Sequence, residues 1–281
     1  MKKAPIEMEA KKMVIDMDKL LKDLSLESEV LIDLLDHLDD LAWNIQTPAE
    51  GWTIQDQVSH LAYFDNAATL ALKEPDRFNS ELANVIAYGE DFPNEIAKQN
   101  HNMAPDKLLE WFKSARTALI SSFHGVDPRS RLPWYGPDMS AASSITARLM
   151  ETWAHGVDIA DALGVRVIPT NRLFHIAHLG YATMPFAHLL REIPIPQVSI
   201  GVELIAPDGS KWTFGPPDPA EVVSGDALDF CLVVTQRRNL ADTTIITSGP
   251  NAANWMQIAQ AFAGTPGPGR KPTLKEESKA N

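Results

Sequence analysis

Residues 150–164, METWAHGVDIADALG, combine acidic and imidazole side chains with an otherwise apolar helical pattern. Glu151, His155 and Asp158 recur at intervals of four and three, so they project from one face of a helix. A carboxylate and an imidazole one helical turn apart can both reach a single metal ion. Asp158 could hydrogen-bond to the imidazole and fix its orientation. The same spacing is common on solvated helix surfaces, so at this point both interpretations stay open.

A third ligand would have to come from a facing helix, and His60 is the best candidate. It lies in QVSHLAYF, where the Val, Leu and Phe neighbours predict an apolar helix face. Two histidines and one carboxylate would leave coordination positions open, as in catalytic rather than structural metal sites. Asp56, one turn before His60, could support such a site, although its place three residues after Thr53 also fits a capping box. A buried histidine without any metal is the simpler alternative for His60.

Composition and charge limit the classes of partner. Lys and Arg number 25 against 37 Asp and Glu, a formal net charge of −12, which argues against nucleic acid as a partner. The single cysteine, Cys231, excludes an intrachain disulfide and lies among apolar residues, as a small buried hydrophobe would. No apolar run has the length of a membrane span, and no signal peptide is recognisable. We therefore expect a cytoplasmic protein with no membrane partner.

The chain changes character after residue 194. Before it, amphipathic patterns and breakers predict helices; after it, two alternating runs around Asp208-Gly209 predict a β-hairpin. No GxSxG, GxGxxG or Walker sequence is present, so serine-hydrolase, Rossmann and P-loop chemistry have no motif support. The predicted helices span residues 16–43, 53–72, 79–100, 105–123, 140–163, 170–190 and 251–264.

Two segments together carry a resemblance to a known family. GWTIQDQVSHL, followed about ninety residues later by ARLMETWAHGVDIADALG, resembles the N-terminal domain of the mycothiol-dependent maleylpyruvate isomerases, within the wider DinB-like metal-binding bundles. The stretches RLPWYGPDMSAASSITARLMETWAHG and GDALDFCLVVTQRRNLADTTI resemble one uncharacterised subgroup of that family. The resemblance is fairly specific over the helical part and weaker over the C-terminal part.

This resemblance implies a divalent metal ion, most often zinc, held by His60, Glu151 and His155. It also implies a low-molecular-weight thiol of the mycothiol or glutathione type as cosubstrate, because a metal cation stabilises the thiolate. In the isomerases the thiolate adds to a conjugated double bond, rotation follows, and elimination gives the trans product. Other DinB-like proteins are thought to transfer thiols instead.

A dicarboxylate substrate would need a cationic anchor, which this sequence does not identify by any motif. Trp134 and Tyr135, just upstream of the proposed ligand helix, could wall the mouth of a pocket or merely cap the bundle. Arg237 is kept as a substrate-binding candidate, although a structural role is the simpler reading of each arginine considered. The arginines considered are Arg131, Arg148, Arg237 and Arg238.

The sequence thus predicts an α+β fold in which a DinB-like four-helix bundle precedes a smaller α+β domain. The bundle is expected over residues 1–165, with a boundary that could extend to about 190, the second domain over 166–264, and a disordered or loosely docked tail over 265–281. The expected function is a metal-dependent, thiol-using isomerase or thiol transferase. A non-catalytic binding module and a metal-dependent hydrolase are the alternatives. The expected partners are a small thiol and a small substrate, and a homodimer is kept open as the assembly.

Overall fold

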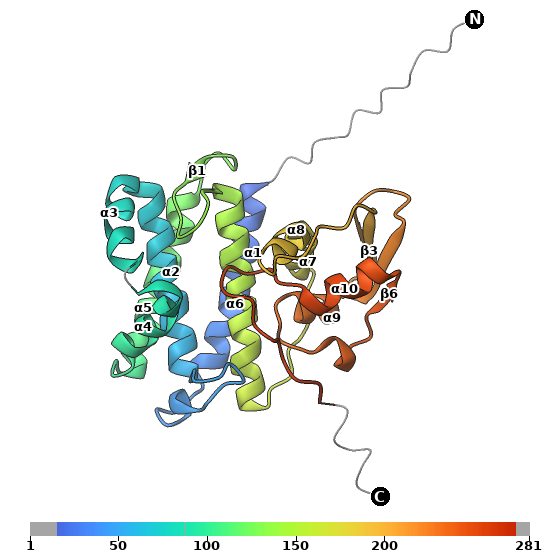
Figure 1. The fold of residues 1–281 in the computed structure, drawn as a ribbon. Coiled ribbons are helices and arrows are strands. Elements are labelled where there is room, and N and C mark those ends of the chain that lie inside the picture. Colours follow the sequence, from blue (N-terminus) through green and yellow to red (C-terminus); the bar gives the residue numbers. More distant parts are fainter. Residues whose placement is uncertain (1–15, 87, 274–281) are drawn as a thin grey trace, which may run out of the picture.

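Four long helices run side by side and form a bundle (Figure 1). The computed structural model describes residues 16–86 and 88–273 of the 281-residue chain. The four are α1, α2, α5 and α6. Each contributes large, fully buried apolar side chains to the interior, for example Leu24, Leu61, Phe112 and Leu149. The shorter helices α3 and α4 pack against α2. The bounds of these helices are α1 Met17–Leu35, α2 Ile54–Lys73, α3 Pro75–Ile86, α4 Phe92–Asn100, α5 Pro105–Phe123 and α6 Ala141–Leu163.

Local capping signals set the limits of α2 and α6, the two helices that carry the candidate ligands. At the start of α2 the Thr53 hydroxyl accepts from the Asp56 backbone N–H, and the Asp56 carboxylate accepts from the Thr53 N–H at 2.8 Å. This is the capping box predicted from the sequence. The Ser140 side chain caps α6, and Gly164, with φ 66°, ends it in the left-handed conformation. These contacts fix where α2 begins and where α6 begins and ends.

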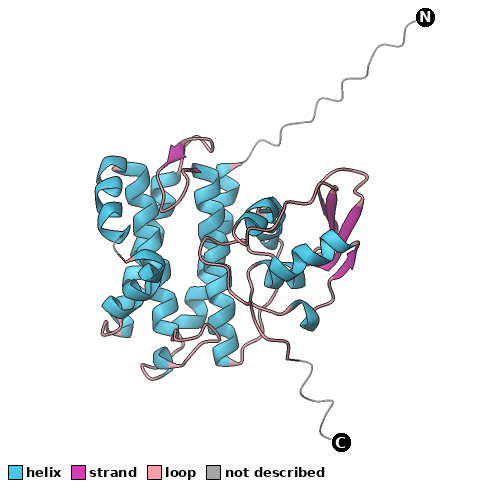
Figure 2. Cartoon of the chain, in the orientation of Figure 1, coloured by secondary structure: helices cyan, strands magenta, loops and turns pink. Residues whose placement is uncertain are grey.

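The C-terminal region is a mixed sheet with helices packed against it (Figure 2). Its strand order is β4-β3-β5-β6; β3 pairs parallel with β5, and the other neighbours are antiparallel. The hairpin predicted around Asp208-Gly209 is confirmed as β3–β4. The bounds here are α7 Leu173–Ala182, α8 Met184–Leu189, β3 Ile200–Ile205, β4 Lys211–Phe214, β5 Glu221–Asp226, α9 Ala227–Val234, β6 Ile246–Ser248 and α10 Pro250–Ile258. The expected α+β class with an N-terminal bundle is thus observed, and a two-stranded ribbon, β1 Arg131–Leu132 with β2 Met139–Ser140, precedes α6.

Several predicted helices are shorter or divided. The first ends at Leu35 rather than 43, since the Asp39 carboxylate accepts from the Ala42 N–H at 2.9 Å and starts a separate 3-10 turn, Ala42–Asn44. Leu41, which extended the apolar pattern, is 82% exposed. The helix therefore ends where the hydrogen bonds of the local turn begin, although the apolar pattern continues beyond that point.

The predicted helices over 79–100 and 170–190 each divide in two. The first breaks near Gly89, whose φ of 58° is left-handed, and a 3-10 turn, Gly89–Asp91, precedes α4. The second breaks at Thr183, and Pro185 lies in the first turn of α8, where its missing N–H costs nothing. No helix in the described part of the chain has both the length and the apolar character needed to cross a bilayer.

The C-terminal region is tied to the bundle by ion pairs along α1 and α6. Arg172 Nε lies 2.6 Å from Glu27 Oε2, and His175 Nε2 lies 2.8 Å from Asp23 Oδ2. Arg238 forms a bidentate pair with Asp161 at 2.6 Å. Five of these six side chains are at most 20% exposed, so the ion pairs lie largely within the contact between the bundle and the C-terminal region.

Part of the tail that we expected to be disordered or loosely docked makes defined contacts. The carbonyl of Arg270 accepts from Asn239 Nδ2 at 2.7 Å, and its guanidinium lies 2.6 Å from Asp158 Oδ1 on α6. The backbone N–H of Thr273 donates to the Asp242 carboxylate. Residues 265–273 therefore run along the junction, because Asp158 offers a buried carboxylate there. Residues 274–281, the rest of that expected tail, lie outside the described residues, as do residues 1–15, where a signal peptide was sought.

Candidate metal centre

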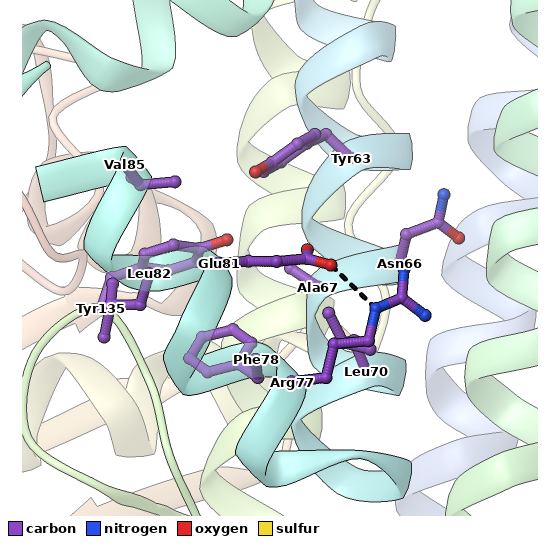
Figure 3. A pocket seen from close by; sticks show the side chains of 10 residues that line it. All are labelled: Tyr63, Asn66, Ala67, Leu70, Arg77, Phe78, Glu81, Leu82, Val85 and Tyr135. Carbon is purple, nitrogen blue, oxygen red and sulfur yellow. Dashed lines mark hydrogen bonds and ion pairs between the residues drawn. The ribbon is translucent and has the colours of Figure 1, made fainter. Parts of the chain in front are cut away.

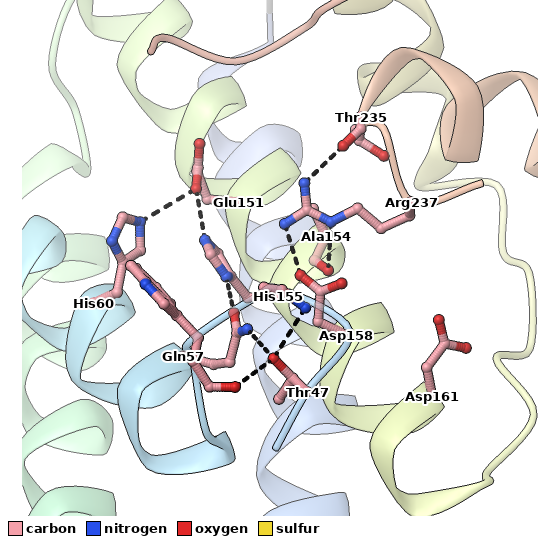
Figure 4. Close-up of polar contacts among 12 residues, drawn as sticks. Thr47, Gln57, His60, Glu151, Ala154, His155, Asp158, Asp161, Thr235 and Arg237 are labelled. Atoms are coloured by element: carbon pink, nitrogen blue, oxygen red, sulfur yellow. Dashed lines mark hydrogen bonds and ion pairs between the residues drawn. The ribbon is translucent and has the colours of Figure 1, made fainter. Parts of the chain in front are cut away.

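Three side chains from α2 and α6 converge on one point. Glu151 Oε2 lies 3.0 Å from His155 Nε2 and 3.4 Å from His60 Nε2, and one ligand atom from each of the three residues lies within 4.8 Å of the others (Figure 4). Two atoms bound about 2.1 Å from a tetrahedral zinc ion are about 3.4 Å apart. The spacing therefore fits a divalent metal ion, and two nitrogens with one carboxylate oxygen suit zinc.

The imidazole of His155 is held by a short chain of hydrogen bonds. Its Nδ1 donates to Gln57 Oε1, because the amide oxygen can only accept, and Gln57 Nε2 donates to Thr47 Oγ1 at 2.8 Å (Figure 4). Thr47 Oγ1 in turn donates to the Trp52 carbonyl at 2.8 Å. This chain selects the tautomer in which Nε2 carries the lone pair, the form that binds a metal.

The surroundings shift the pKa values of His60 and Glu151 toward the charge states that a metal site needs, a neutral imidazole and an ionised carboxylate. Burial, together with the neighbouring His155, lowers the pKa of His60 to about 4, so the ring is neutral near pH 7. Burial alone would raise the pKa of Glu151, but its contacts with the imidazoles of His155 and His60 hold it well below its usual value. His60 Nδ1 is buried and has no hydrogen-bond partner among the described residues.

Aromatic rings enclose the cluster. Trp52, from the loop before α2, stacks on His155 with ring centres 5.9 Å apart and also lies 5.3 Å from the His60 ring. Phe64, one turn beyond His60, lies 4.6 Å from it. The Trp52 indole N–H donates to Asn94 Oδ1 at 2.7 Å, and Asn94 lines a cleft of about 570 Å³ between the start of α4 and the C-terminal segment. The cluster is thus largely shielded from water, with an open cleft beyond Trp52.

Neither Asp56 nor Asp158, which we considered as supporting residues, has a hydrogen bond or ion pair with His60 or His155 in the described part of the chain. Asp158 is fully buried, but its carboxylate pairs with Arg237 at 2.9 Å and with Arg270, and Gln57 occupies the place at His155 Nδ1 that we had considered for it. Asp56 is engaged in the capping box. Both carboxylates therefore have structural partners, because backbone N–H groups and guanidiniums lie closer to them than the imidazoles do.

The expected substrate-binding residues lie in two other places. Arg237 donates to Asp158, to the Ala154 carbonyl at 3.2 Å and to the Thr235 carbonyl at 2.6 Å, so its donors serve the junction with α6 (Figure 4). Trp134 stacks on Phe78, with ring centres 5.9 Å apart.

Tyr135 lines a pocket of about 270 Å³ on the side of α2 that faces α3 (Figure 3). Tyr63 lies in the same pocket, and Arg77 pairs with Glu81 at 2.9 Å near them. The ring of Phe64 contacts both His60 and Tyr135, with centres 4.6 Å and 5.5 Å away. Phe64 therefore separates this pocket from the candidate metal centre.

Two residues of the site were missed in the sequence. Gln57 lies one turn before His60 on the same face of α2, and its placement on an otherwise apolar stripe could have indicated a buried polar role. Trp52 lies directly before the N-cap Thr53, in the GWT sequence that carries part of the family resemblance. Both contact the imidazole of His155.

Comparisons with known proteins agree with this architecture. Residues 24–160 match the family model of the mycothiol maleylpyruvate isomerase N-terminal domain. The uncharacterised proteins MT0041 and Rv0036c, from two strains of Mycobacterium tuberculosis, are each 43% identical over 248 residues, which is 88% of this chain and 96% of theirs. Crystal structures of mycothiol-dependent maleylpyruvate isomerase and of its histidine-to-alanine variant match with TM-scores of 0.56 and 0.55 at 16% identity, over 84% of this chain and 96% of those chains. Residues 24–160 therefore form a domain of the mycothiol maleylpyruvate isomerase N-terminal type, and the chain as a whole belongs to one family with the two uncharacterised mycobacterial proteins.

Proposed function

We propose that this protein is a metal-dependent, thiol-using enzyme, an isomerase or thiol transferase that acts on a small electrophilic or cis-enoyl substrate. The observation that carries the proposal is the convergence of His60, Glu151 and His155 around one point, with the His155 ring held by Gln57 in the metal-binding tautomer. The match of residues 24–160 to the mycothiol maleylpyruvate isomerase N-terminal domain supports a thiol such as mycothiol as the cosubstrate.

The three ligands would hold a divalent ion, most readily zinc, and leave positions for other groups. When bound, that ion would supply Lewis acidity and lower the pKa of a thiol brought next to it. Glu151, whose side chain is the most exposed of the three at 20%, marks the side from which small molecules would approach.

The chain's own thiol is not available for this chemistry. Cys231 is fully buried in α9, its Sγ contacts the Leu173 carbonyl at 3.6 Å, and burial raises its pKa well above the usual value. A buried, protonated thiol is inert. A thiol nucleophile would therefore have to come from a cosubstrate rather than from the protein.

The surrounding residues contribute orientation and exclusion of water. Gln57 and Thr47 keep the His155 lone pair directed at the cluster, and the rings of Trp52 and Phe64 cover the two histidines. Low dielectric around the site strengthens each charge interaction within it.

Turnover measurements on the zinc-loaded full chain test the proposal. Mycothiol, glutathione and bacillithiol would each be combined with cis-enoyl acids and with simple electrophiles, and His155→Ala would serve as the inactive control. We expect turnover that needs both zinc and a thiol. Turnover with water alone would replace this proposal with a metal-dependent hydrolase, and zinc binding without any turnover would favour a binding module.

A further inference from the structure

The structure distinguishes the arginines that the sequence left equivalent. Arg131 donates to the Asp138 carbonyl in the exposed β1–β2 ribbon, Arg237 is held at Asp158, and Arg238 is paired with Asp161. Arg148 differs, because its Nη2 is buried and has no hydrogen-bond partner in the part of the chain that the structure describes. A buried donor without a partner is costly, so such a group calls for an explanation.

Arg148 lies beside the candidate metal centre. It precedes Glu151 by three residues and His155 by seven, so the three share one stripe of α6. Its guanidinium carbon lies 5.8 Å from the centre of the Phe64 ring, and that ring lies 4.6 Å from His60. The charge of Arg148 is also among the causes that lower the pKa of His60, after burial and the charge of His155.

The ion-pair cluster at Asp65 carries an excess of positive charge, while the nearby Glu151 carboxylate is directed at the two histidines. Arg148 Nε lies 3.0 Å from Asp65 Oδ1, but the same carboxylate also receives Arg116 at 2.7 Å. Asp65 is fully buried, and both arginines are only 3% exposed. Two guanidiniums facing one carboxylate leave a net charge of about +1 in a buried place, where an uncompensated charge is unfavourable.

Arg116 donates from all three of its guanidinium nitrogens, whereas Arg148 donates from Nε to Asp65 and its Nη2 has no partner among the described residues. Arg116 donates to both Asp65 oxygens, to Ser28 Oγ and to Thr152 Oγ1. The excess charge and the free donor therefore coincide at Arg148, one helical turn from Glu151. A ligand carboxylate at Nη2 would supply both the missing acceptor and the missing negative charge.

We propose that Arg148 Nη2 binds a carboxylate group of the substrate, so that the site takes small carboxylic acids in preference to neutral electrophiles. This inference rests on the proposed function for where the substrate reacts, but the binding of the anion is independent of turnover.

Calorimetric titration of the full chain with maleate, a small cis-dicarboxylate, tests this inference, with dimethyl maleate as the neutral control. Both zinc-loaded and metal-free protein would be used. We expect maleate to bind wild type, Arg148→Met to weaken binding about 10- to 100-fold, and Arg148→Lys to restore part of it. Dimethyl maleate should bind weakly to all three.

Arg148→Met should fold, because Arg116 alone still neutralises Asp65. Arg172→Met is the control: it removes a partly buried ion pair with Glu27 on α1 that involves neither Asp65 nor Arg148, and should leave maleate affinity unchanged. Equal maleate binding by wild type and Arg148→Met, or no maleate binding by wild type in either form, would overturn the inference. Zinc stoichiometry in the same samples separates the two claims. Arg148-dependent maleate binding without zinc binding would reject only the metal-dependent function, and zinc binding without such maleate binding would reject only the role of Arg148.

Discussion

Gln57 offers the sharpest perturbation of the candidate centre, because it touches the metal-binding apparatus without being a ligand. Gln57→Leu keeps the approximate size of the side chain and removes the acceptor at His155 Nδ1. The imidazole then loses its fixed tautomer and orientation. Partners of this kind typically contribute 10- to 100-fold to metal affinity. That factor corresponds to about 1.4–2.8 kcal/mol of binding free energy.

The effect on folding should be smaller than the effect on metal binding. Thr47 Oγ1 loses the bond from Gln57 Nε2 but keeps its own bond to the Trp52 carbonyl. We therefore expect the free energy of unfolding of the metal-free protein to fall by about 1 kcal/mol. Gln57→Glu keeps an acceptor for His155 and should retain most of the affinity.

Competition with a fluorescent zinc chelator measures the affinity of each variant, and urea unfolding measures its stability. Gln55→Leu is the matched control on the same turn of α2, since the Gln55 amide donates to the carbonyls of Asn100, His101 and Met103 rather than to the site. It should reduce stability and leave zinc affinity unchanged. Zinc affinity in Gln57→Leu equal to that of wild type would refute the role assigned to this hydrogen bond.

Three further outcomes are expected. In metal-free protein the lowered pKa of His60, about 4, means that the unfolded chain binds more protons between pH 6.5 and 4. Stability is thus present above pH 6.5 and lost on acidification, by about 2 kcal/mol at pH 5 relative to pH 8; His60→Gln should flatten this loss in urea titrations, and an unchanged pH profile would contradict it. Asp158→Asn should lower the free energy of unfolding by about 3 kcal/mol, because it leaves Arg237 and Arg270 facing no charge, while zinc stoichiometry stays at the wild-type value; a loss of zinc would mean that Asp158 supports the site after all. Removing metal with a chelator should leave the helical circular dichroism unchanged, because the bundle core is apolar, whereas unfolding would indicate a structural metal.

Local signals in the sequence predicted those parts of the fold that depend on neighbouring residues. The capping box at Thr53, the helix end at Gly164 and the hairpin at Asp208-Gly209 were all readable, because each depends on residues a few positions apart. Strand β5 was not predicted, since its parallel pairing with β3 joins residues about twenty positions apart and has no turn signal. Periodicity overextended the first helix, because Leu41 fits the pattern but faces solvent.

The candidate site was readable only in part, for a similar reason. His60, Glu151 and His155 stood out because imidazole and carboxylate groups interrupted apolar helix faces at helical spacing. Which polar residue meets His155, and which arginine lacks a partner, depends on the packing of α2 against α6. A single sequence does not contain that information, so Gln57 was missed and Arg148 was grouped with three arginines that have other partners.

Zinc stoichiometry after equilibrium dialysis is the most direct test of the central claim that His60, Glu151 and His155 form one metal centre. Wild type, Glu151→Ala and His155→Ala would be compared with His175→Ala, which alters a histidine at the junction with α1 instead. The account predicts a single zinc ion per chain in wild type and in His175→Ala, and loss of that ion in the other two variants with retained helical structure. Zinc-free wild type, or full zinc occupancy in His155→Ala, would contradict it.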